Sequence, residues 1–307
     1  MHADALPVAR APESAVAAVV PTGPQTAKQL RFALTDAAGF SKMPKPRAGD
    51  WLASFKEPGQ SFAEYLRSRP VRARPGQDVL AFQPVGGFCE TQRAVVQATI
   101  EFAGVWFDLK TRTLEALPLP GADWSRQRSF SWVDEPVTQY LTDWFLDNAL
   151  PPQRPDDAVC LVGVTAGDLY PEPGWNYVFG QASLHRRVGI YSVARFFAKF
   201  WGREETPATR LQALRRSFKL VVHETGHTFG VEHCIEYECT MNGSNSLEES
   251  DRGPLHLCPP CLRKLHVNRG FDVLERYRGL LALYRKHGLE HEARWTLERM
   301  QRIATVP

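Results

Sequence analysis

Residues 223–233 read His-Glu-Thr-Gly-His-Thr-Phe-Gly-Val-Glu-His, and this stretch decides how the rest of the chain is interpreted. On a helix with about 100° per residue, His223 and His227 lie about 40° apart and one turn along the axis, so both imidazoles can reach one metal ion. Gly230 can adopt the left-handed conformation that ends a helix, and the chain can then turn and bring His233 to the same ion. We therefore predict a metal site made of His223, His227 and His233.

Three neutral nitrogen ligands leave a fourth tetrahedral position open, which is the arrangement of a catalytic zinc site rather than a structural one. Glu224 follows the first ligand and is angled away from direct coordination, so it can act as a base toward a water molecule at the zinc. We predict that Glu224 takes the water proton and passes it to a leaving amine, while zinc polarises the scissile carbonyl. The alternative is that these are ordinary helix histidines, but Gly230 and His233 at fixed offsets make that pattern rare by chance.

The helix that carries the motif is expected to start at Thr206-Pro207, because threonine caps free amides and proline suits the first helical position. Apolar residues then recur at spacings of three and four, which predicts that the helix buries the face opposite its metal ligands. These residues are Leu211, Leu214, Phe218 and Val221.

Four of the six cysteines, Cys234, Cys239, Cys258 and Cys261, fall within one short segment after the motif. In a reducing compartment, clustered cysteines are more often metal ligands than disulfides, and the second pair has the spacing of a zinc knuckle. Four thiolates leave no open position, so we predict a second, structural zinc, with two disulfides as the alternative. Because Cys234 adjoins His233, this zinc would hold the backbone that positions the third catalytic ligand.

Composition limits the classes of partner. The 307 residues include 37 basic and 34 acidic ones, a formal net charge of +3, which gives no reason to expect binding to nucleic acid or to an anionic membrane. No run approaches the roughly 18 apolar residues that cross a bilayer, and the short apolar run at residues 15–20 lacks the pattern of a secretory signal. We expect a cytoplasmic protein, with Cys89 and Cys160 as core cysteines rather than ligands.

The predicted fold class is α/β (α+β), because strand-like and helical segments alternate. Residues 79–85 and 158–164 are continuous apolar runs typical of buried strands, and residues 175–181 and 188–196 are rich in aromatic and β-branched residues. Residues 91–107 and 137–150 have helical spacing, and two further helices are expected at 271–287 and 290–304. The predicted organisation is a flexible extension over 1–45, a catalytic subdomain over 46–233 with the sheet and the active-site helix, and a C-terminal subdomain over 234–307.

The eleven-residue motif is the metzincin signature, and the residues after it resemble the archaemetzincin family. Cys234 follows the third histidine directly, Thr240 and Met241 follow Cys239, and Cys258-Pro259-Pro260-Cys261 stands further on. Residues 241–249 and 257–265 also look like that family. The resemblance covers roughly residues 77–268, and no ligand position departs from the pattern.

This resemblance implies a zinc metallopeptidase with two zinc ions per chain and a peptide or protein substrate. It implies a metzincin-like twisted mixed sheet above a cleft, a smaller C-terminal part with helices and the cysteine site below it, and Met241 packed beneath the catalytic zinc. In such a fold the edge of the sheet binds peptide as an added strand, and chain order points to residues 177–182.

Two other readings remain open from the sequence: a catalytically inactive, zinc-stabilised interaction module, and a zinc hydrolase of non-peptide amides. The intact Glu224 argues against the first. Tyr237, Tyr170 and Asn176 are candidates for stabilising the oxyanion besides zinc. Substrate specificity and oligomeric state are not visible in the sequence.

Overall fold

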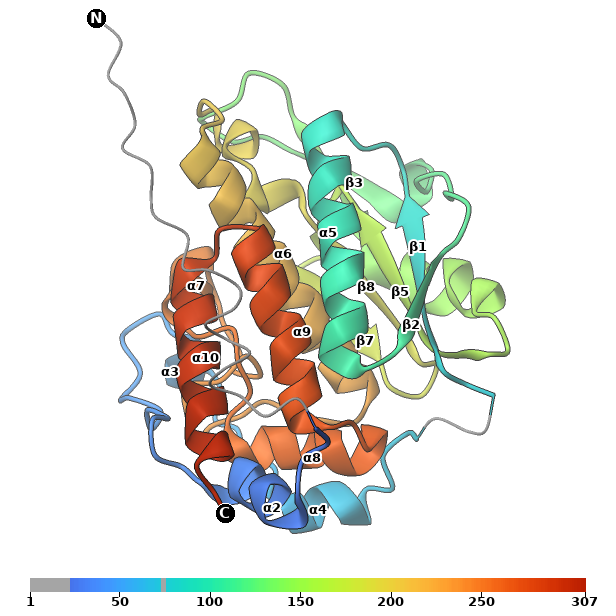
Figure 1. Cartoon of the computed structure of the whole chain (residues 1–307). Coiled ribbons are helices and arrows are strands. Elements are labelled where there is room, and N and C mark those ends of the chain that lie inside the picture. The colour runs from blue at the N-terminus through green and yellow to red at the C-terminus, as the bar shows by residue number, and fades with distance from the viewer. Residues whose placement is uncertain (1–22, 73–75) are drawn as a thin grey trace, which may run out of the picture.

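The computed structural model describes residues 23–72 and 76–307. Its centre is a five-stranded sheet in the order β2-β1-β5-β8-β7, next to a three-stranded sheet in the order β3-β4-β6 (Figure 1). The strands are β1 (Val79–Val85), β2 (Lys110–Thr113), β3 (Ser125–Arg128), β4 (Val137–Leu141), β5 (Ala158–Thr165), β6 (Asp168–Tyr170), β7 (Gly180–Ser183) and β8 (Val188–Ser192).

The larger sheet is mixed, as predicted. β1 pairs in parallel with β2 and β5, and β5 pairs in parallel with β8, whereas β7 runs antiparallel to β8. Parallel neighbours need crossover connections. Helix α5 (Glu90–Phe107) connects β1 to β2, the connection from β5 to β8 contains β6 and β7, and β7 and β8 are joined by a short turn. β7 lies at one end of the strand order and is therefore an edge strand, as expected for the predicted peptide-binding segment.

Alternation along the central strands divides the apolar side chains between two cores. In β1, Leu80 and Phe82 point into a large core shared with the helices, and Val79 and Ala81 point into a smaller core on the other face. Both faces of a strand buried in this way must be apolar, which explains the continuous apolar runs at residues 79–85 and 158–164.

Helices cover one face of the sheet and build the C-terminal part (Figure 1). α5 packs beside the motif helix α6, and α9 and α10 lie next to them, so the large core extends from the sheet to the C-terminal helices. The helices are α2 (Ala27–Thr35), α3 (Trp51–Ser54), α4 (Phe62–Arg67), α5 (Glu90–Phe107), α6 (Pro207–Thr228), α7 (Leu247–Arg252), α8 (Pro259–Arg269), α9 (Val273–Lys286) and α10 (Glu290–Ala304).

Several sequence-based expectations are wrong in part. The strand expected at residues 175–181 begins only at Gly180 and ends at Ser183. Residues 137–150 do not form one helix: residues 137–141 are β4, paired with β3 and β6, and a short π-helical turn (Trp144–Ala149) follows. Of the extension over 1–45, residues 1–22 lie outside the described part, but the segment from 23 onward is folded. α2 starts with a capping box between Thr26 and Gln29, and its Ala33 is fully buried in the large core. The boundary between 233 and 234 stays a prediction.

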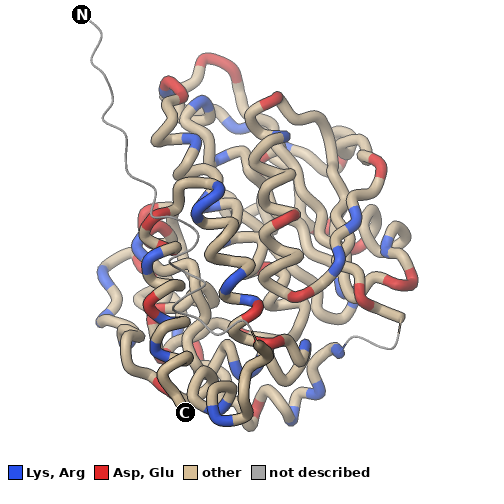
Figure 2. Tube along the Cα trace, in the orientation of Figure 1, with Lys and Arg blue, Asp and Glu red and all other residues tan. Residues whose placement is uncertain are grey.

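Basic and acidic residues are mixed along the chain (Figure 2). Several of the basic residues of the C-terminal part hold this part to earlier segments: Arg299 bonds Asp36 at the end of α2, and Arg276 donates to the main-chain oxygen of Trp106 in α5. Within residues 23–72 and 76–307, no helix has the length and apolar character needed to span a membrane.

A buried ion pair connects β6 of the smaller sheet to the segment that follows β8 in the larger sheet. Arg195 donates to both carboxylate oxygens of Asp168 at 2.7 Å, with only 4% and 1% of the two side chains exposed. Gln139 donates to the same carboxylate at 2.7 Å, and the Arg195 guanidinium lies 3.7 Å from the ring centroid of Tyr177. The pair therefore sets the position of Tyr177 just ahead of β7.

Replacing Asp168 by alanine should lower the free energy of unfolding by about 3–5 kcal/mol, because the buried Arg195 guanidinium loses its counter-charge. Urea denaturation of wild type and Asp168→Ala measures this. Asp157→Ala is the matched control: its partner is Arg112, both side chains are more than a third exposed, and water screens that pair, so the loss should be much smaller. Equal losses of unfolding free energy in the two variants would show that burial of the Asp168–Arg195 pair does not make it the more stabilising one.

Candidate metal centre and cleft

α6 begins and packs as the sequence predicts, with one exception. Thr206 caps it by accepting from the Thr209 amide, and Pro207 occupies the first turn. Phe218 and Val221 are fully buried, whereas Leu211 is 36% exposed and does not belong to the buried face. The buried stripe fixes the rotation of the helix, so the opposite face, with His223 and His227, is turned toward the cleft.

The three predicted histidines come together. Their ring centroids are 4.6, 5.0 and 5.2 Å apart, and one nitrogen from each ring lies within 4.8 Å of the other two. The Nε2 atoms of His223 and His227 are 3.0 Å apart. Two ligands of a tetrahedral zinc with Zn–N bonds of about 2.0–2.1 Å stand roughly 3.3 Å apart, so this spacing fits a shared ion.

Hydrogen bonds at the other ring nitrogen decide where the protons are. Nδ1 of His223 lies 3.0 Å from the carbonyl oxygen of Thr240, and Nδ1 of His227 lies 2.7 Å from that of Val231. A carbonyl oxygen only accepts, so each Nδ1 carries the hydrogen and each neutral ring presents a lone pair at Nε2. Burial, with His233 adding to it, lowers the pKa of His227 to about 4, which keeps this ring in its ligand form.

Two Nε2 lone pairs that face each other at 3.0 Å repel unless a cation lies between them. Three imidazole nitrogens are also a donor set that zinc prefers. The residues therefore fit a zinc ion, and they leave room for a further ligand on the cleft side.

The turn after α6 brings in the third histidine. Gly230 has φ +79°, the left-handed conformation predicted for it, and its amide donates to the carbonyl of His227 at 2.8 Å. His233 then approaches the pair, and its Nδ1 lies 2.8 Å from Oε1 of Glu57. Met241 is 1% exposed, and its sulfur would lie 2.8 Å from a Cβ at Gly226, so it packs against α6 between the first two histidines.

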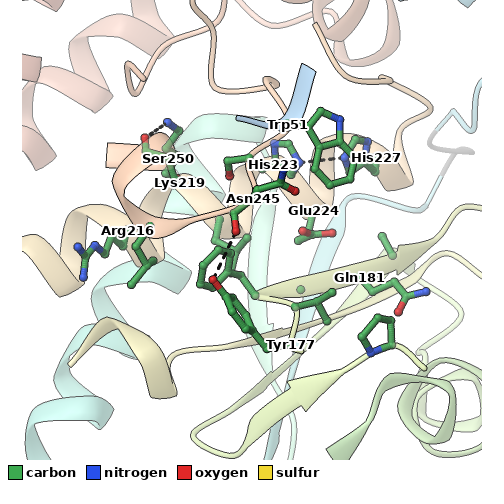
Figure 3. A pocket seen from close by; sticks show the side chains of 18 of the residues that line it. Trp51, Tyr177, Gln181, Arg216, Lys219, His223, Glu224, His227, Asn245 and Ser250 are labelled. Atoms are coloured by element: carbon green, nitrogen blue, oxygen red, sulfur yellow. Dashed lines mark hydrogen bonds between the residues drawn. The ribbon is translucent and has the colours of Figure 1, made fainter. Parts of the chain in front are cut away.

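Glu224 faces the same cavity (Figure 3). It is 7% exposed, and burial raises its pKa to about 8. A Cβ on Gly180 would stand 2.9–3.0 Å from the end of the Glu224 side chain, so β7 crosses directly over this carboxyl group. A side chain at position 180 would therefore force the Glu224 carboxyl group to move.

The cleft has a volume of about 690 Å³. All residues from 177 to 182 line one wall, and the opposite wall includes Asn242, Ser244 and Asn245 from the segment after Met241. The Phe179 carbonyl accepts from the Ser192 amide at 2.8 Å, so the main chain of Phe179 faces β8. In an antiparallel pair the direction alternates, and the amides and carbonyls of Gly180 and Ala182 therefore point to the open edge.

The four clustered cysteines also come together, and all are buried without disulfides. The sulfurs of Cys234 and Cys258 are 3.6 Å apart, close to the roughly 3.8 Å that Zn–S bonds of about 2.3 Å imply for a tetrahedron. Backbone amides of Met241 and Cys258 donate to the sulfur of Cys239 at 3.5 and 3.4 Å, as suits a thiolate. Neither Cys89 nor Cys160 belongs to the cluster. Cys160 is buried as predicted, but the prediction that Cys89 lies in the core is wrong, because it precedes the first turn of α5 and is exposed.

Hydrogen bonding among the sulfurs shifts the pKa of three of the cysteines in opposite directions. Bonds from Cys239, Cys258 and Cys261 lower the pKa of Cys234, whereas bonding to Cys234 and Cys239 raises the pKa of Cys258 and of Cys261. Without a cation these bonds therefore favour the thiolate of Cys234 over those of Cys258 and Cys261. A divalent ion is what allows all four to ionise together.

Several residues of the site escaped the sequence analysis. Glu57 and Trp51 come from a segment far ahead of the motif, and no local pattern marks them. Lys219 lies one helical turn before His223, and its amine donates to the carbonyl of Ser250 in α7. Conversely, the proposed oxyanion candidates are elsewhere: none of Tyr237, Tyr170 and Asn176 lines the cleft.

Comparison with known proteins adds independent findings. A family model described as peptidase family M54 matches residues 155–267. The chain is similar to archaemetzincin-2 of Macaca fascicularis, with 37% identity over 263 residues, 76% of this chain and 71% of the relative. Archaemetzincin-2 of Rattus norvegicus is 34% identical, with the same coverage of both chains. The crystal structure of archaemetzincin from Archaeoglobus fulgidus is 28% identical, with a TM-score of 0.46, over 61% of this chain and 99% of that one.

Proposed function

Because this chain belongs to the archaemetzincins, a family of zinc metallopeptidases, we propose that it hydrolyses peptide bonds at its three-histidine centre with Glu224 as the general base. The observation that carries the proposal is the pair of Nε2 lone pairs, 3.0 Å apart, whose rings both hold their hydrogens at Nδ1. We also propose two zinc ions per chain: a catalytic one held by His223, His227 and His233, and a structural one held by Cys234, Cys239, Cys258 and Cys261.

Held by His223, His227 and His233, a zinc ion would supply a Lewis acid that polarises the scissile carbonyl and lowers the pKa of water. Glu224, which lines the cleft beside His223 and His227, accepts the proton of the attacking water and delivers it to the leaving nitrogen. Burial favours the protonated carboxyl and makes it a strong base once ionised, and a cation at the imidazoles favours the ionised form.

The substrate is proposed to bind as an added strand on β7. The open-edge amides and carbonyls of Gly180 and Ala182 would pair with the peptide, and close approach at Gly180 places the peptide over Glu224. The C-terminal part of a peptide antiparallel to β7 would lie toward Tyr177 and Asn245. There the two walls meet, because the Tyr177 hydroxyl donates to the main-chain oxygen of Asn245 at 3.4 Å. Residues after the scissile bond would therefore lie in this part of the cleft.

Metal analysis tests the two-site proposal. Wild type should carry two equivalents of zinc, His227→Ala should lose one, and Cys258→Ala should lose the other. The melting temperature should fall far more for Cys258→Ala, because its zinc closes a loop of the core, than for His227→Ala. Disulfides between the cysteines, or one ion in wild type, would contradict the proposal.

Glu224→Gln should lower kcat by about 10²–10⁴-fold, because the amide cannot take the proton. Zinc content should stay at the wild-type value, since Glu224 is not a ligand. The assay is digestion of a peptide library by both proteins. Cleavage by both at equal rates would remove Glu224 from the mechanism, and cleavage by neither would favour an inactive module or a hydrolase of other amides.

Ala182→Pro should raise KM for peptides several-fold, because it removes an open-edge amide while leaving the β7–β8 hydrogen bonds in place. kcat should change less than KM. The control is Gln181→Ala, which changes a side chain at the neighbouring position and keeps every main-chain amide. An unchanged KM for Ala182→Pro would show that peptides do not pair with β7.

A further inference from the structure

Residues 49–60, which we call the strap, precede the sheet in sequence but contact the metal centre directly. At its first end the main-chain amide of Trp51 donates to both oxygens of the Glu249 carboxylate, at 2.9 and 3.1 Å. The side-chain amide of Asn245 donates to the Ser54 hydroxyl at 3.2 Å. This end is therefore held on the cleft wall that follows Met241.

The other end of the strap is held on the turn after α6. The side-chain amide of Gln60 donates to the Gly230 carbonyl at 3.0 Å and accepts from the Glu232 amide at 3.3 Å. Its main-chain oxygen accepts from the amine of Lys264 in α8. The strap is thus anchored on both sides of His233.

Between the anchors, the strap surrounds the third histidine. Oε1 of Glu57 lies 2.8 Å from Nδ1 of His233, and the Trp51 ring meets the His233 ring edge-on with centroids 5.2 Å apart. Oε2 of Glu57 is buried and, among the described residues, has no hydrogen-bond partner. A buried carboxylate oxygen without a partner is costly unless positive charge lies nearby.

The hydrogen-bond partner of Nδ1 in His233 differs from those of the other two histidines. His223 and His227 donate to neutral carbonyls of residues close to them in the chain, whereas the partner of His233 is a carboxylate 176 positions away. A carboxylate is the stronger acceptor: it fixes the tautomer and ring orientation and makes the opposite nitrogen a better donor to a metal.

We infer that Glu57 is a positioning residue for the metal centre: it holds His233 with Nε2 toward the ion, and through it the strap forms part of the active site. The inference rests on the proposed zinc at the three histidines. It also explains the buried Oε2 of Glu57, whose charge the bound cation would balance through the imidazole.

The test is a Co²⁺ titration of the metal-depleted full chain with a competing chelator, in wild type and Glu57→Gln. Cobalt bound by the cysteines shows an intense sulfur charge-transfer band, and cobalt bound by the histidines shows only weak visible bands, so each site reports its own affinity. Affinity at the histidines should fall by about 10–100-fold in Glu57→Gln, while affinity at the cysteines stays unchanged. Glu57→Asp should recover part of the loss.

Glu232→Gln is the matched control, because this carboxylate adjoins His233 in sequence but is exposed. If the histidine site of Glu57→Gln binds Co²⁺ as tightly as that of wild type, the inference about Glu57 is overturned and the proposed function is not. An equal loss in Glu232→Gln, or weakening at the cysteines as well, also overturns it, because the effect would then be one of net charge or of folding. Absence of any histidine-bound cobalt in wild type overturns both the inference and the proposed function.

Discussion

The orientation of three imidazole rings is the constraint on which the rest of this structure depends. Each ring must present Nε2 to one point, and each is held there through its Nδ1 atom, by the Thr240 and Val231 carbonyls and by the Glu57 carboxylate. The spacing of four residues on α6 supplies two rings, and the left-handed turn at Gly230 supplies the third. Neutral, fixed imidazoles are what a zinc ion needs, and their mutual repulsion in its absence is the cost of keeping the site ready.

Neighbouring elements then protect this arrangement. The cysteine cluster begins one residue after His233 and includes the residue before Thr240, so a metal there would fix the backbone on two sides of the histidine centre. On the other wall, the buried pair of Asp168 and Arg195 supports Tyr177 and with it the segment leading into β7. The cleft thus lies between two parts with separate supports: a metal at the cysteines would stiffen one, and a buried ion pair stiffens the other.

The parts that could be predicted from the sequence are those with a local signal. The histidine and cysteine spacings, the glycine turn and the apolar strands at 79–85 and 158–164 each depend on short-range geometry. The spacing of apolar residues predicts a helix at residues 137–141. These residues form a strand because they pair with β3 and β6, and no local pattern reveals that pairing. α2 did carry a local signal, the capping box of Thr26 and Gln29, but the composition of that segment predicts a flexible extension. Glu57 carried none, because its role exists only through a contact across 176 positions.

A single measurement can decide whether one ion is bound by the Nε2 atoms of all three histidines. A crystal structure of the zinc-loaded protein, with anomalous data at the zinc edge, measures it directly. We predict a peak at about 2.0–2.1 Å from Nε2 of His223, His227 and His233, with all three Nδ1 atoms turned away from it. A peak bound through any Nδ1, or no peak among the three rings at full zinc occupancy of the cysteine cluster, would contradict it.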